Sequence, residues 1–268
     1  MTDSLVSSVS SALSQTDRAR SKFYWVMSAL LLCVALVGFA RSFYLRLLFS
    51  AGQPGLALSV LLHGILMTAW FVLLLAQASL VATGNRRLHC RLGIAGVVLG
   101  AGILIANSFV TWRLFLVAAA DGADFNDAGV LDFASQFFWG NMVGMILVAV
   151  LVILAIAYRK HHEAHKRFML FASIILVSPA FDRIAQWPLF SDTGFQVDIL
   201  VALFHWGGLL LLVAAVVVND LARQRRLHPA TLLASFAIGI SAPTTGIVAG
   251  SEFGLAVVQR LAALASMT

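Results

Sequence analysis

Seven long apolar stretches, separated by shorter polar connections, dominate the chain. They run over residues 23–40, 56–82, 91–117, 136–158, 167–187, 197–219 and 229–249. Each comes close to the roughly 20 residues that a helix needs to cross about 30 Å of hydrocarbon. Because lipid satisfies no backbone hydrogen bonds, such stretches are stable in a membrane only as helices. The pattern predicts an all-α fold: a polytopic membrane helix bundle of about seven transmembrane helices.

The regions on either side of these stretches differ in character. Residues 1–22 form a polar, Ser-rich N-terminal tail, residues 23–250 the transmembrane bundle, and residues 251–268 a short amphipathic C-terminal segment. The last apolar stretch is the least typical, because it is rich in Ala, Ser, Thr and Gly and contains Pro243. Six spans plus a re-entrant or surface segment is therefore an alternative topology.

Composition and charge placement support a membrane protein and indicate its orientation. Hydrophobic residues make up 60% of the chain and charged residues 11%, against roughly 45–50% and 25% in soluble domains. The net charge is +6, and thirteen of the eighteen Lys and Arg residues lie in four short segments. These segments are Arg18–Lys22, Arg86–Arg91, Arg159–Arg167 and Arg223–Arg226. By the positive-inside rule they face the cytoplasm, as does the N-terminus. The basic excess therefore reports orientation in the membrane, with the lipid bilayer and no nucleic acid as partner.

Two histidines lie at matched depth inside predicted spans. His63 is about seven residues into the second span and His205 about eight into the sixth, and both spans are entered from outside. At 1.5 Å per residue, both lie on the order of 10–12 Å below the outer boundary. Two imidazoles so placed on different helices can ligate one iron axially, as in membrane-embedded b-type haem sites. The alternative is that each histidine hydrogen-bonds a neighbouring helix or lines a polar cavity.

The other histidines gather at the predicted cytoplasmic boundary. The run Arg86-Arg87-Leu88-His89 recurs as Arg225-Arg226-Leu227-His228, and His165 occupies a similar position at the fifth span. We expect His89 and His165 to form a second candidate haem-binding pair. As an alternative, His89, His165 and His228 are interfacial residues that cap helices and meet lipid phosphates. His161 and His162 are expected to be solvated.

A few other polar residues are expected near the outer face, close to the depth of His63 and His205. Arg41 closes the first span and Asp182-Arg183 the fifth, so Arg41 and Arg183 are candidate partners for haem propionates, which favour guanidinium groups. Salt bridges and interfacial anchoring are the alternative roles. Asp198 precedes His205 by seven residues and shares its helical face.

Three segments of the chain resemble a known protein family. They are Leu62-His63-Gly64 with Gln77, then Arg87-Leu88-His89-Cys90-Arg91-Leu92-Gly93, then Ala164-His165-Lys166-Arg167-Phe168-Met169. The pattern resembles a large, poorly characterised family of bacterial multi-helix membrane proteins. It is distantly similar to transmembrane di-haem b-type cytochromes and to haem-handling factors of cytochrome oxidase assembly. The resemblance covers about residues 60–185 and implies haem binding with electron or haem handling. The chain departs from it at Cys90, where the family has Arg, and in the fourth span, which has no histidine.

These observations lead to three functional hypotheses. The first is a haem b protein that moves electrons across the membrane, with a quinone as a possible partner, or that handles haem. The second is a non-catalytic accessory or scaffold subunit of a larger membrane complex that binds lipid or pigment. The third is a small-solute transporter with His63, Asp198 and His205 along its path.

Overall fold

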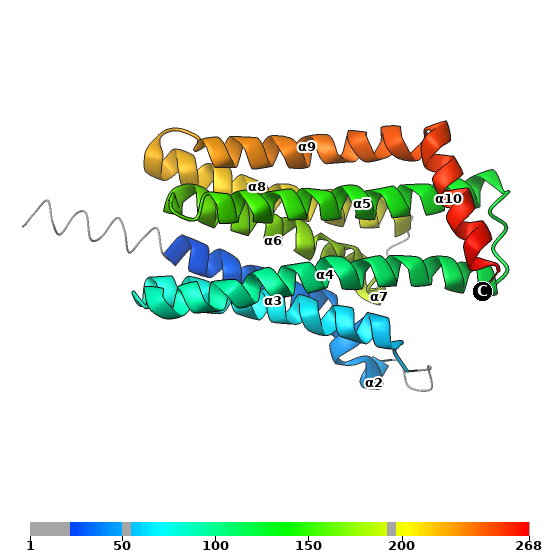
Figure 1. Cartoon of the computed structure of the whole chain (residues 1–268), viewed down its shortest axis with the longest axis horizontal. Coiled ribbons are helices and arrows are strands. Elements are labelled where there is room, and N and C mark those ends of the chain that lie inside the picture. Colours follow the sequence, from blue (N-terminus) through cyan, green and yellow to red (C-terminus); the bar gives the residue numbers. More distant parts are fainter. Residues whose placement is uncertain (1–21, 50–54, 192–196, 268) are drawn as a thin grey trace, which may run out of the picture. The chain divides into compact units, whose positions relative to one another are not determined.

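The fold is all-α across the part of the chain that the computed structural model describes, which is residues 22–49, 55–191 and 197–267. Six helices are long and apolar enough to cross a membrane (Figure 1). They are α3 (Leu58–Ala82), α4 (Arg86–Ala120), α5 (Ala128–Ala157), α6 (His162–Ala185), α8 (Val197–Gln224) and α9 (Pro229–Ala249). A shorter apolar helix covers Lys22–Gly38. The predicted multi-pass membrane fold is confirmed, and the chain contacts the lipid bilayer.

Four short elements complete the described chain. The π-helix η1 (Ala40–Tyr44) and the single-turn helix α2 (Arg46–Phe49) follow the first helix. The helix α7 (Pro188–Ser191) precedes α8, and α10 (Glu252–Ala265) ends the chain. The predicted polar tail lies outside the described residues up to position 21, as do residues 192–196 between the fifth and sixth predicted spans.

Several helices begin earlier than the apolar pattern predicts. α4 starts at Arg86 instead of residue 91, α5 at Ala128 instead of 136, and α6 at His162 instead of 167. Polar residues extend these helices because a capped end satisfies its backbone donors in the interface, as Asp127 Oδ1 does for the N–H groups of Gly129 and Val130. As a result, His89 and His165 lie inside the first turn of α4 and α6, and not in connecting turns.

The last predicted span is a continuous helix. α9 covers 21 residues with Pro243 inside it, so its length is that of a full crossing. The shortest apolar helix among the described residues is instead Lys22–Gly38. The amphipathic C-terminal segment is α10, which differs in direction from α9 (Figure 1).

The chain divides into two compact units, and each is described by itself. Unit 1 contains the described residues of 1–53, 67–100 and 176–223. Unit 2 contains those of 54–66, 101–175 and 224–268. His205 therefore belongs to unit 1 and His63 to unit 2.

In unit 1, small residues let helices approach closely. A Cβ added to Gly38 would lie 2.5 Å from Ala180 Cβ and 2.6 Å from the Ala180 carbonyl oxygen in α6. The indole N–H of Trp25 also donates a hydrogen bond to Ser79 Oγ in α3, at 3.0 Å. Such contacts between small residues are a common basis of helix association in membranes, where hydrophobic burial contributes little.

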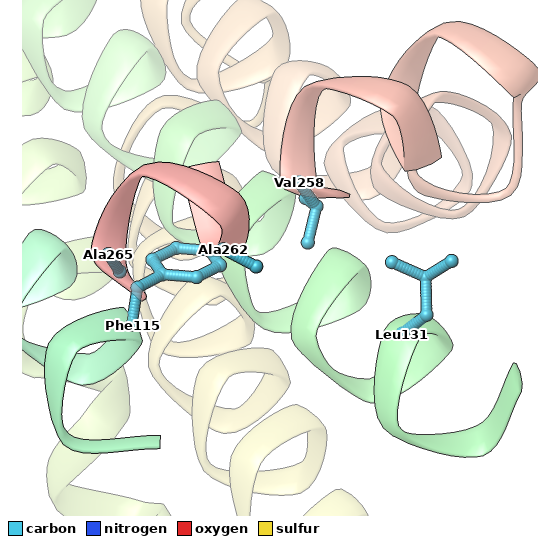
Figure 2. Close-up of a cluster of buried hydrophobic side chains, with 5 residues drawn as sticks. All are labelled: Phe115, Leu131, Val258, Ala262 and Ala265. Carbon is cyan, nitrogen blue, oxygen red and sulfur yellow. The ribbon is translucent and has the colours of Figure 1, made fainter. Parts of the chain in front are cut away.

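In unit 2, α10 packs onto α4 and α5. Val258, Ala262 and Ala265 of α10 meet Phe115 of α4 and Leu131 of α5 in a buried apolar cluster (Figure 2). Two hydrogen bonds tie α5 to the end of the chain: Ser135 Oγ donates to the Ala249 carbonyl at 2.8 Å, and Trp139 Nε1 to the Gly254 carbonyl at 3.2 Å.

The span α6 is the most buried of the six. In its most apolar window 61% of residues are buried, against 11–17% in the other five spans. Most of its surroundings are therefore protein, whereas the other five expose their apolar side chains to lipid. Protein surroundings explain how α6 can carry Glu163, Lys166, Arg167, Asp182 and Arg183.

We expect Gly38→Ala to destabilise the protein, because the new methyl group meets the Ala180 backbone, which cannot move without shifting α6. Overpacking of this kind costs about 1–3 kcal/mol. Thermal unfolding of the detergent-purified protein measures the effect as a lower Tm. The control is Gly144→Ala in α5, where nothing lies within 4 Å of the added Cβ. Equal Tm values for the two variants would contradict the close contact at Gly38.

Candidate functional site

The side chain of His205 is paired with a carboxylate. In unit 1, His205 Nδ1 in α8 lies 2.8 Å from Asp182 Oδ1 in α6. Both side chains are about a quarter exposed, 27% and 28%. A carboxylate accepts the proton carried by Nδ1, which orients the ring and leaves Nε2 as the nitrogen that can bind a ligand. The edge of the Trp206 ring lies against the same imidazole.

The contact of Asp182 with His205 was not predicted from the sequence. The predicted position of Asp198 on the His205 face stays a prediction. The side chain of Asp198 lies outside the described part of the structure. A usable signal was present: Asp182 lies near the outer end of its span, at a depth comparable with that of His205. A search for opposite polar groups at equal depth on different helices would have found the pair.

His63 lies in the second turn of α3, in unit 2. Its Nδ1 atom is buried and has no hydrogen-bond partner among the described residues. A buried polar atom without a partner costs about 1–3 kcal/mol. Such a nitrogen is the kind of group that a bound ligand would satisfy. His63 and His205 belong to different units, and joint ligation of one iron by the pair stays a prediction.

At the predicted cytoplasmic end, His165 forms a hydrogen bond within unit 2. Its Nδ1 lies 2.8 Å from the carbonyl oxygen of Ala155, in the last turn of α5. That carbonyl is one of the four that a helix end leaves without an intrahelical donor. Because a carbonyl oxygen only accepts, Nδ1 donates this hydrogen bond. In unit 1, the backbone carbonyl of His89 accepts a hydrogen bond from Gln77 Nε2 at 3.2 Å.

The remaining predicted residues occupy different surroundings. The Arg41 guanidinium in η1 lies 5.4 Å from the centre of the Phe49 ring, a cation–π contact that agrees with interfacial anchoring. Arg183 is exposed in the last turn of α6. His228 caps α9, since its Nδ1 accepts the Ala230 N–H at 3.1 Å. The helix-capping alternative is thereby confirmed for His228.

A charged network at the start of α6 was not predicted as such. Glu163 Oε1 lies 2.6 Å from Lys166 Nζ, and Glu163 Oε2 lies 2.6 Å from an Arg167 guanidinium nitrogen. Arg167 is 1% exposed and also donates from Nε to Thr231 Oγ1 in α9 at 3.1 Å. The i,i+3 and i,i+4 spacing of one acid and two bases was the signal in the sequence. The network joins α6 to α9 inside unit 2.

Comparison with known proteins finds no similar protein. No family model, no curated protein and no solved structure matches this chain. Within the described ranges, no group of three or more His, Cys, Asp or Glu side chains is placed to hold a metal ion. Haem iron can be held by only two protein side chains, so a haem site does not require a group of three.

Glu163→Gln should destabilise the protein more than Lys166→Gln. The first substitution removes the carboxylate from the buried Arg167, and hydrogen bonds to charged groups contribute about 1.5–3 kcal/mol. The second removes only the partly exposed ion pair, which contributes about 0–1 kcal/mol. Denaturant or thermal unfolding in detergent compares the two variants. A larger loss of stability in Lys166→Gln would contradict the prediction that the Glu163–Arg167 contact contributes more than the Glu163–Lys166 ion pair.

Proposed function

We propose that the chain is an integral membrane haem b protein of the bacterial inner membrane that transfers electrons across the bilayer or handles haem. His63 and His205 are its ligands toward the outer face. The observation that carries the proposal is the contact between His205 Nδ1 and Asp182 Oδ1. Histidines that ligate metals almost always donate their second ring N–H to a carboxylate, a backbone carbonyl or water.

The chemistry of the donor set fits haem. Asp182 holds one nitrogen of His205 and so presents the other to a ligand, and it makes that nitrogen more basic. His63 contributes a buried nitrogen that lacks a partner among the described residues. When bound, haem b supplies a one-electron redox centre. His63 and His205 would hold it, and Asp182 would tune its potential through His205.

A second site at the cytoplasmic face would involve His89 and His165. His165 Nδ1 lies 2.8 Å from the backbone carbonyl of Ala155, which is another of the partners that orient metal-ligating histidines. Two sites near opposite faces would let electrons cross the hydrocarbon layer, with a quinone as donor or acceptor at one face. Arg41 and Arg183 are the propionate partners in this proposal.

The absorption spectrum of the purified protein tests the proposal. Protein from haem-replete cells should show a Soret band and, after dithionite reduction, a sharp α-band. His63→Ala and His205→Ala should each remove at least the outer haem, because a bis-histidine site loses half of its protein ligands. The control is His162→Ala, an exposed histidine that should leave the spectrum unchanged. A colourless wild-type protein would overturn the proposal and favour an accessory subunit.

Asp182→Asn should weaken haem retention without removing His205. Loss of a partner that orients a metal ligand typically lowers affinity about 10–100-fold. Haem transfer to apomyoglobin measures the rate of loss, and redox titration measures the potential. Asp182→Glu should recover much of the retention, since it restores a carboxylate. If Asn and Glu behave identically, the role of Asp182 is structural only.

A further inference from the structure

Two buried polar atoms on neighbouring helices of unit 2 have no hydrogen-bond partner among the described residues. They are His63 Nδ1 in α3 and Asn107 Nδ2 in α4. Asn107 is only 6% exposed, although it lies inside an apolar span. An amide without a partner in such surroundings loses the hydrogen bonds that it makes in water, and buried polar groups are therefore normally paired. The two atoms need a common explanation.

The contacts between α3 and α4 repeat every three or four residues. Within unit 1, a Cβ added to Gly96 would lie 3.3 Å from the Leu73 side chain, and one added to Gly100 would lie 3.3 Å from that of Trp70. The two helices are joined by residues 83–85 and run antiparallel. A step of four residues along α4 therefore matches a step of three toward the start of α3. Alternating steps of three and four are the spacing of two helices packed side by side.

In unit 2 the same spacing reaches His63 and Asn107. A Cβ added to Gly102 would lie 3.7 Å from the Leu66 side chain. His63 precedes Leu66 by three residues on α3, and Asn107 follows Ile103 by four residues on the buried face of α4. One further step of the seam beyond the Leu66 contact therefore brings His63 opposite Asn107.

The two side chains can satisfy each other. Both unpartnered atoms are buried, which leaves no room for a water molecule beside either. The Asn107 amide carries an acceptor oxygen and a donor nitrogen, and rotation about its Cβ–Cγ bond exchanges them at little cost because this torsion is broad and two-fold. With its oxygen toward His63, the amide accepts the proton of Nδ1. The ring nitrogen Nε2 then carries no proton.

We propose that Asn107 is the positioning residue of His63: its amide oxygen accepts the hydrogen bond of Nδ1–H, and Nε2 is left as the nitrogen that binds a ligand. The identification of that ligand as haem iron rests on the proposed function, whereas the hydrogen bond itself does not. Asp182 is the corresponding partner of His205 Nδ1. An amide orients the ring without adding a charge to the span.

Nitrogen-15 NMR of the full-length protein with labelled histidine tests the hydrogen bond. Protein from haem-depleted cells is used so that iron does not determine the position of the ring proton, and His63→Ala identifies the His63 signals. The wild type should carry this proton on Nδ1. Asn107→Leu removes the acceptor and should shift the signals toward the Nε2–H form. Asn107→Asp keeps an acceptor oxygen of the same reach and should retain the Nδ1–H form.

The control is Asn141→Leu, which removes another amide of unit 2. Asn141 Nδ2 already donates to Thr111 Oγ1 at 3.4 Å, so its loss should leave the His63 signals unchanged. A wild-type proton on Nε2, or His63 signals that do not respond to Asn107→Leu, would overturn the proposal. Equal shifts in Asn107→Leu and Asn141→Leu would show a general change of packing and overturn it as well.

Haem retention separates this inference from the proposed function. In protein from haem-replete cells, Asn107→Leu should lower haem affinity about 10–100-fold, measured by transfer to apomyoglobin, and Asn107→Asp should recover much of it. A colourless wild type would overturn the haem assignment, and the NMR result would still decide the hydrogen bond. A Soret band together with the Nε2–H form of His63 would overturn the role of Asn107 alone.

Discussion

The absence of water from the hydrocarbon layer is the constraint on which this structure depends. Every backbone N–H and C=O inside the layer must be satisfied by the chain itself, which makes each crossing a helix. The same constraint moves helix ends into the interface, where side chains can cap them. Asp127, His228 and Ser251 each accept backbone N–H groups at the start of α5, α9 and α10. The spans α4, α5, α6 and α8 are longer than the apolar stretches predicted for them.

The span α6 shows how polar contacts can be kept in such an environment. Its middle is buried and carries small or apolar residues, for example Ala172 and Ala180, each 0% exposed. Its polar contacts are at the two ends: Glu163 and Arg167 with Thr231 at one, and Asp182 with His205 at the other. Each set pairs charged groups that would be expensive to leave unpaired in these surroundings.

The sequence predicted the spans well, since a run of about 20 apolar residues has one stable conformation in lipid. It predicted helix starts less well, because Arg86 to Arg91 reads as a turn by polarity alone, whereas in the structure it is the first turn and a half of α4. The histidine depths followed from residue counting. Their partners did not: Asp182 and His205 are 23 positions apart, and only the packing of α6 against α8 within unit 1 brings them together. Helical periodicity relates Asp198 to His205 because both lie on one helix, but it cannot relate residues of two different helices.

Asp182 gives His205 a charged partner, whereas the partner of His165 is the neutral carbonyl of Ala155. A contact with a backbone carbonyl requires no additional charge in the span. A carboxylate in a membrane span costs about 2.5–3.5 kcal/mol at the helix centre and less toward the boundary. That cost is offset in part by the hydrogen bond that Asp182 accepts from His205 Nδ1. The Asp182–His205 contact therefore places a charge in the span that the His165–Ala155 contact does not need.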